Sequence, residues 1–99
     1  MQRTARLDHP EVREIVPSHH CLVRFRERRP FRELGADAVT EALIAALEDA
    51  DVSGWPPGWV SGDRESGLWA VSGDLAFPLE RTPTPGRYLA TTCLSKPRR

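Results

Sequence analysis

Apolar residues recur at helical spacing most clearly in the segment from Ala36 to Ala50. The repeating apolar positions are Val39, Leu43, Ala46, Leu47 and Ala50. This spacing puts apolar side chains on one face of a helix, and the alanines between them have high helix propensity. We therefore predict an amphipathic helix over residues 36–50 whose apolar face belongs to the core.

A second helix is predicted upstream, from about His19 to Arg29. Ser18 stands at the N-cap position, where its hydroxyl can accept a hydrogen bond from an amide of the first turn. Pro30 ends the segment because proline cannot continue a helix. Its narrow apolar stripe, suited to packing on a sheet, consists of Cys21, Leu22 and Phe25.

Strand patterns flank the two helices. A weak strand within residues 11–16 precedes them, and three strands are predicted after them, at 68–71, 75–79 and 87–94. The first two of these three are joined by Ser72-Gly73-Asp74, which is short enough for a hairpin. Residues 51–67, rich in Gly, Pro, Ser and Trp, indicate an ordered loop with room for a short strand near Trp59 and Val60.

This order predicts one α+β domain over residues 1–99, with its core at about 12–94: a weak N-terminal strand, two helices, then an antiparallel meander of three to four strands. Among 99 residues, 39% are apolar and no run is long enough to span a membrane. The N-terminus also lacks the apolar stretch of a secretory signal. We expect a cytoplasmic protein, in which Cys21 and Cys93 are partly buried thiols rather than a disulfide.

The net charge is zero, which argues against strong nonspecific attraction to nucleic acid. The charges are nevertheless sorted along the chain. Residues 1–35 hold eight Arg against five acids, residues 36–60 hold five acids and no base, and residues 61–99 hold six bases against four acids. One acidic segment therefore lies between two mildly basic ones.

The most informative residues are His20, Arg24 and Arg28, at positions i, i+4 and i+8 of the first predicted helix. This spacing brings them onto one face, and Glu27 can pair with Arg24. In RNA cleavage a base must take the 2'-hydroxyl proton, and cations must stabilise charge that builds on the phosphate. His20 suits the first task and arginine the second, so we expect neither a metal nor a cofactor.

The pattern H-x-x-x-R-x-x-E-R, the second helix and a meander ending in Ala90-Thr91-Thr92-Cys93-Leu94 resemble small bacterial and phage RelE-like toxins of the barnase-like ribonuclease superfamily. The resemblance covers roughly residues 12–94. Cys21 departs from it by replacing the usual Ala, and the Lys-rich strand positions of ribosome-dependent members are absent. The resemblance implies a toxin–antitoxin endoribonuclease that cleaves RNA, not DNA, by 2'-hydroxyl attack and is silenced by a small antitoxin protein.

The same resemblance implies two sets of site residues, since the superfamily gathers active-site groups on the concave face of its sheet. The expected catalytic set is His20, Arg24, Arg28, Arg87 and Thr92. The expected substrate-binding set is Arg64, Arg81 and Tyr88.

Other interpretations stay open. His20 could instead satisfy its own helix turn, and the arginines of that helix could form structural ion pairs. The tryptophans Trp55, Trp59 and Trp69 are typical of core and loop anchors, although they could stack on bases. The chain could then be a noncatalytic RNA- or protein-binding accessory module, or an interaction protein that uses its Trp-rich loop. A zinc site built from His19, His20 and the two cysteines is disfavoured, because neighbours on a helix point about 100° apart.

Overall fold

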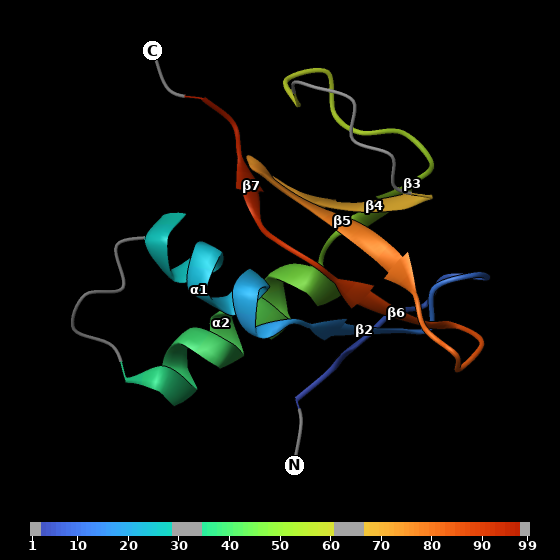
Figure 1. Cartoon of the computed structure of the whole chain (residues 1–99), viewed down its shortest axis with the longest axis horizontal. Coiled ribbons are helices and arrows are strands. Elements are labelled where there is room, and N and C mark those ends of the chain that lie inside the picture. Colours follow the sequence, from blue (N-terminus) through green and yellow to red (C-terminus); the bar gives the residue numbers. More distant parts are fainter. Residues whose placement is uncertain (1–2, 29–34, 61–66, 98–99) are drawn as a thin grey trace.

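The computed structural model describes residues 3–28, 35–60 and 67–97, which form two helices beside a seven-stranded mixed sheet (Figure 1). The predicted α+β architecture is confirmed. The helices are α1 (His19–Arg28) and α2 (Ala36–Glu48), close to the predicted bounds. Neither is long and apolar enough to cross a membrane.

The core lies between the helices and the sheet. Helix α1 buries Cys21 and Phe25 there. Helix α2 contributes Val39, Leu43 and Leu47, as its apolar spacing predicts, and also Ile44, which was not predicted. Ser18 caps α1, because its Oγ accepts a hydrogen bond from the Cys21 amide at 3.0 Å. The local pattern therefore determines both where α1 begins and which face it buries.

The sheet order is β1-β2-β6-β5-β4-β3, and β7 also pairs with β5. The strands are β1 (Ala5–Arg6), β2 (Glu14–Pro17), β3 (Asp51–Ser53), β4 (Leu68–Ser72), β5 (Leu75–Arg81), β6 (Arg87–Ala90) and β7 (Leu94–Ser95). Strands β4, β5 and β6 form the predicted antiparallel meander. Strand β2 runs parallel to β6, and Ile15 is the partner of Tyr88.

The predicted single strand over residues 87–94 is wrong, since it breaks between β6 and β7. The cause lies in Pro78, in the middle of β5. Its carbonyl accepts a hydrogen bond from the Thr91 amide at 3.2 Å, but proline has no N–H to return to the Thr91 carbonyl. The Ser18 hydroxyl donates to that carbonyl instead, at 3.0 Å. The Ser18 side chain therefore both caps α1 and satisfies the Thr91 carbonyl at the strand break.

Two other expectations need correction. Strands β1 and β3 were not predicted, and Trp59 and Val60 lie in a turn and the coil after it rather than in a strand. Trp69 is fully buried, as predicted for an anchor, whereas Trp55 is 81% exposed and does not belong to the core. The predicted hairpin at Ser72-Gly73-Asp74 is confirmed, since β4 and β5 pair on either side of it. Gly73 adopts φ +59°, a positive value that a type II′ turn requires at its first central position.

Candidate functional site

One flank of α1 carries the motif residues. At about 100° per residue, His20, Arg24 and Glu27 lie to one side of the buried stripe formed by Cys21 and Phe25. Arg28 lies between the stripe and this flank, and its Nε donates to the Cys93 carbonyl at 3.4 Å. The end of α1 therefore lies against the C-terminal segment that follows β6.

The side chains on this flank are accessible to solvent. His20 is exposed, and its imidazole forms no hydrogen bond with any other residue that the structure describes. Arg24 Nη1 lies 3.2 Å from Glu27 Oε1, with side-chain exposures of 36% and 55%. A surface pair of this kind contributes about 0–1 kcal/mol to stability. Its main effect is to orient the Arg24 guanidinium along the helix.

A groove of about 270 Å³ opens beside the end of α1. We call it the helix groove, and it is lined by Glu27, Arg28, Asp74, Leu75, Ser95, Lys96 and Pro97. The Lys96 amide donates to the Asp74 carbonyl at 2.8 Å, which fastens the C-terminal segment to the β4–β5 hairpin. Lys96 thus joins Arg28 as a second cation at the groove.

Sequence reasoning missed Lys96 as a site residue. It is the only lysine in the chain and lies two residues after the predicted last strand, so its type and position were a signal. What the sequence could not show is that β7 lies against α1. That placement depends on the break in the strand and brings residues far apart in sequence to one groove.

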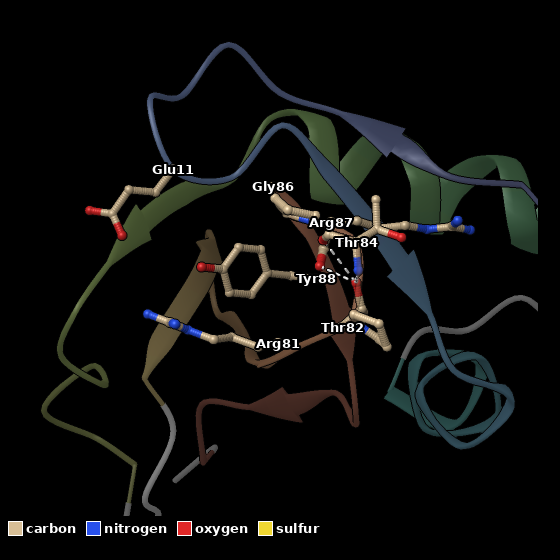
Figure 2. A pocket seen from close by; sticks show the side chains of 9 residues that line it. Glu11, Arg81, Thr82, Thr84, Gly86, Arg87 and Tyr88 are labelled. Carbon is tan, nitrogen blue, oxygen red and sulfur yellow. Dashed lines mark hydrogen bonds between the residues drawn. The ribbon is translucent and has the colours of Figure 1, made fainter.

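A second hollow, of about 370 Å³, lies at the β5–β6 turn (Figure 2). We call it the turn pocket, and it is lined by Glu11 and residues 81–88. Hydrogen bonds within the turn fix its shape. Thr82 Oγ1 donates to the Arg87 carbonyl at 2.6 Å, and the Arg87 amide donates to the Thr84 carbonyl at 3.1 Å. Gly86, at φ +81°, presents its carbonyl to the amides of Arg13 and Glu14.

Three predicted site residues meet this pocket, but they do not share one face of the sheet. Arg81 and Tyr88 are cross-strand partners, so their side chains lie on the same face. Figure 2 shows both pointing the same way and Arg87 pointing the other way. Neighbours on a strand alternate in this manner. The Arg87 guanidinium is instead held by Glu14, with Nε 3.1 Å from Oε1.

The predicted catalytic set is divided between the two ends of β6. The β2–β6 register pairs Glu14 with Arg87 at one end and Pro17 with Ala90 at the other, where α1 begins. Three residues of strand separate these ends, which is about 10 Å. Thr92 is half-buried in the break between β6 and β7. Arg64 lies outside the described residues.

The two cysteines contribute little reactivity. Both are thiols rather than a disulfide, as predicted, and both are fully buried. Burial raises the pKa of Cys21 well above its ordinary value, and the neighbouring Cys93 raises it further. A neutral, buried thiol is a poor nucleophile. Within the described parts of the chain, no three His, Cys, Asp or Glu side chains gather as a metal site would need.

Comparison of the chain with protein-family models, with curated proteins and with solved structures gives no match. The two hollows and the flank of α1 are therefore the basis for assigning a function. Of these, the α1 flank combines an imidazole with cations, while the turn pocket combines a cation with a phenol and a carboxylate.

Proposed function

We propose that this chain is a RelE-like, metal-independent endoribonuclease that binds RNA along the α1 flank and the helix groove. The observation that carries the proposal is that the accessible imidazole of His20 shares the α1 flank with Arg24, and that the end of this helix leads to the groove lined by Arg28 and Lys96. RNA offers the matching chemistry, since its backbone supplies both phosphates and a 2'-hydroxyl. The chain order, in which two short strands and two helices precede the antiparallel meander of β4, β5 and β6, is close to the order that the resemblance implies.

In this mechanism neutral His20 accepts the proton of the 2'-hydroxyl. The 2'-oxygen then forms a bond to the adjacent phosphorus, while the bond from phosphorus to the 5'-oxygen breaks. The protonated His20, or a water molecule, returns a proton to the departing 5'-oxygen, which leaves a 2',3'-cyclic phosphate. Arg24 and Arg28 stabilise the charge that builds on the phosphate oxygens. Thr92 remains a candidate for this site, whereas the Glu14-held Arg87 has no part in it.

The resemblance extends the proposal to biology. The chain would act as a cytoplasmic toxin of a phage or prophage toxin–antitoxin pair, and a small acidic antitoxin would cover the helix groove. Expression without the antitoxin should then arrest growth, and His20→Ala should relieve the arrest. Harmless high expression of the wild type would contradict the toxin assignment.

The test is cleavage of a mixed RNA pool in EDTA, with end-group analysis of the products. His19 provides a matched control, because it is also an exposed histidine, one position away, whose side chain points about 100° from that of His20. We expect cyclic-phosphate ends from wild type and His19→Ala, and a loss of roughly 100-fold or more in His20→Ala. Equal cleavage by both variants would rule out His20 as the base.

A noncatalytic RNA-binding module is the alternative, and one observation favours it. A catalytic base is usually held by a third group, yet His20 has no hydrogen-bond partner among the residues described. On this reading no wild-type preparation cleaves RNA, His20→Ala binds RNA normally, and Arg24→Ala and Lys96→Ala bind it weakly. A filter-binding assay beside the cleavage assay therefore separates the two functions.

A further inference from the structure

We propose that the turn pocket is a second binding site, which takes a nucleoside monophosphate. This site is separate from the proposed RNA site and does not depend on it. Figure 1 shows α1 on one side of the molecule and the β5–β6 turn at the opposite lower corner. A ligand in the turn pocket therefore leaves the helix groove open.

The pocket presents two adjacent donors that nothing else in the described chain uses. Arg81 is exposed and has no acceptor among those residues. The Tyr88 ring is buried, with the residue only 7% exposed, yet its hydroxyl forms no internal hydrogen bond. That hydroxyl is not a buried orphan, since Trp69 Nε1 is the only such atom in the described part of the chain. The exposed edge of Tyr88 must therefore include the hydroxyl, beside Arg81 (Figure 2).

A guanidinium next to a phenol is a recognition pair for a phosphate group. The guanidinium can donate two parallel hydrogen bonds to phosphate oxygens, and the hydroxyl supplies a third. Tyr88 is fixed by its packing in the core, and Arg81 is its cross-strand partner. Because Tyr88 is already immobilised, ligand binding costs little of its conformational entropy.

The wall around these donors is preorganised. Thr82 Oγ1 donates a hydrogen bond to the Arg87 carbonyl across the turn. Pro83 and Pro85 restrict the backbone between Thr82 and Arg87. The Gly86 carbonyl joins the turn to the amides of Arg13 and Glu14 at 2.9 and 3.1 Å. A ligand therefore meets a formed hollow rather than a loop that must first be ordered.

Size and the remaining charge indicate what accompanies the phosphate. Free phosphate would fill little of 370 Å³, a volume within the usual range of small-molecule sites. Glu11 contributes a carboxylate to the same pocket, which would repel a second phosphate but accept hydrogen bonds from N–H groups. A ligand with one phosphate at one end and N–H donors at the other would pair its phosphate with Arg81 and Tyr88 and its N–H groups with Glu11. A nucleobase joined through ribose to a single phosphate has this pattern.

The experiment is a titration of the full chain with the four nucleoside monophosphates, ribose 5-phosphate and inorganic phosphate, followed by chemical shifts of the Tyr88 and Gly86 amides. We expect at least one nucleotide to bind more tightly than ribose 5-phosphate. Arg81→Gln should weaken that binding roughly 10- to 100-fold and Tyr88→Phe about 2- to 10-fold. Arg26→Gln, an exposed arginine on α1, is the matched control and should bind normally.

Specific outcomes overturn the proposal. No shift with any nucleotide at millimolar concentration would do so, as would equal weakening by Arg26→Gln and Arg81→Gln. Equal affinity for ribose 5-phosphate and every nucleotide, unchanged by Glu11→Gln, would show that the pocket does not recognise the nucleobase. Because His20→Ala should bind nucleotide like wild type, a failure of the ribonuclease assignment leaves this result intact, and the reverse also holds.

Discussion

At the scale of single residues, Cys21 links burial to a measurable pH dependence. Burial, and then the nearby Cys93, raises the pKa of its thiol far above the ordinary value of 9.0. Below pH 9 both the folded and the unfolded chain keep this proton, so this thiol does not make the free energy of unfolding depend on pH. Above pH 9 the unfolded chain releases the proton while the folded chain keeps it, and the free energy of unfolding falls.

The expected decline is about 1.4 kcal/mol per pH unit for one such thiol. Urea unfolding at pH 7, 9 and 10 measures it. Other groups also titrate in this range, so the Cys21→Ala variant supplies the baseline. Its stability should be lower at pH 7, because a buried side chain is shortened, but should fall less steeply above pH 9. Parallel curves for the two proteins would show that Cys21 ionises normally in the folded state.

The site residues differ in how far the sequence could predict them. Helical spacing alone grouped His20, Arg24 and Arg28; in the structure His20 and Arg24 lie on one flank of α1, and Arg28 lies between that flank and the buried stripe. Strand alternation could have separated Arg87 from Tyr88, since neighbours on a strand face opposite ways. Lys96 could not have been assigned to the groove from local pattern, because its neighbours there belong to α1 and to the β4–β5 hairpin.

At the scale of elements, the least predictable feature is the break between β6 and β7. The residues on either side of it have a strand pattern, and its cause lies across the sheet in Pro78. Strands β1 and β3 escaped prediction for a related reason, since two or three residues carry no periodic signal and pair only because β2 and β4 are in place. The helices and the meander had enough length for periodicity to show.

The break leads to a prediction about Ser18 and Pro78. Ser18→Ala removes both the cap of α1 and the donor to the Thr91 carbonyl, and should cost about 1–2 kcal/mol. Pro78→Val provides the missing N–H while keeping an apolar side chain, so the valine amide can bond that carbonyl. Ser18→Ala should then cost about 0.5–1.5 kcal/mol less in the Pro78→Val background.

A double-mutant cycle by urea unfolding measures this coupling. Ser95→Ala is the control, because Ser95 forms no side-chain hydrogen bond with the residues described and should not couple to position 78. Strict additivity of Ser18→Ala and Pro78→Val would mean that the Ser18 hydroxyl does not substitute for the absent ladder bond.

At the scale of the whole molecule, the zero net charge conceals a spatial separation. The acids of residues 36–60 lie on α2 and around β3, where Glu41 pairs with Arg3 and Glu48 accepts the Arg6 amide. Arg28 and Lys96 lie away from these partners, at the helix groove, whose lining also includes Glu27 and Asp74. A chain can therefore attract a polyanion at one face without carrying a net positive charge.

This separation predicts the salt dependence of RNA binding. If Arg24, Arg28 and Lys96 each neutralise one phosphate of a single strand, the logarithm of the association constant should fall with the logarithm of salt concentration with a slope of about −2, at about −0.7 per contact. Lys96→Gln should reduce the magnitude of the slope by about 0.7, whereas Arg26→Gln should leave it unchanged. Fluorescence anisotropy with a short labelled RNA over a salt series measures both slopes. A wild-type slope near zero would mean that these cations do not neutralise RNA phosphates. Equal changes in Lys96→Gln and Arg26→Gln would mean that RNA does not bind at the helix groove.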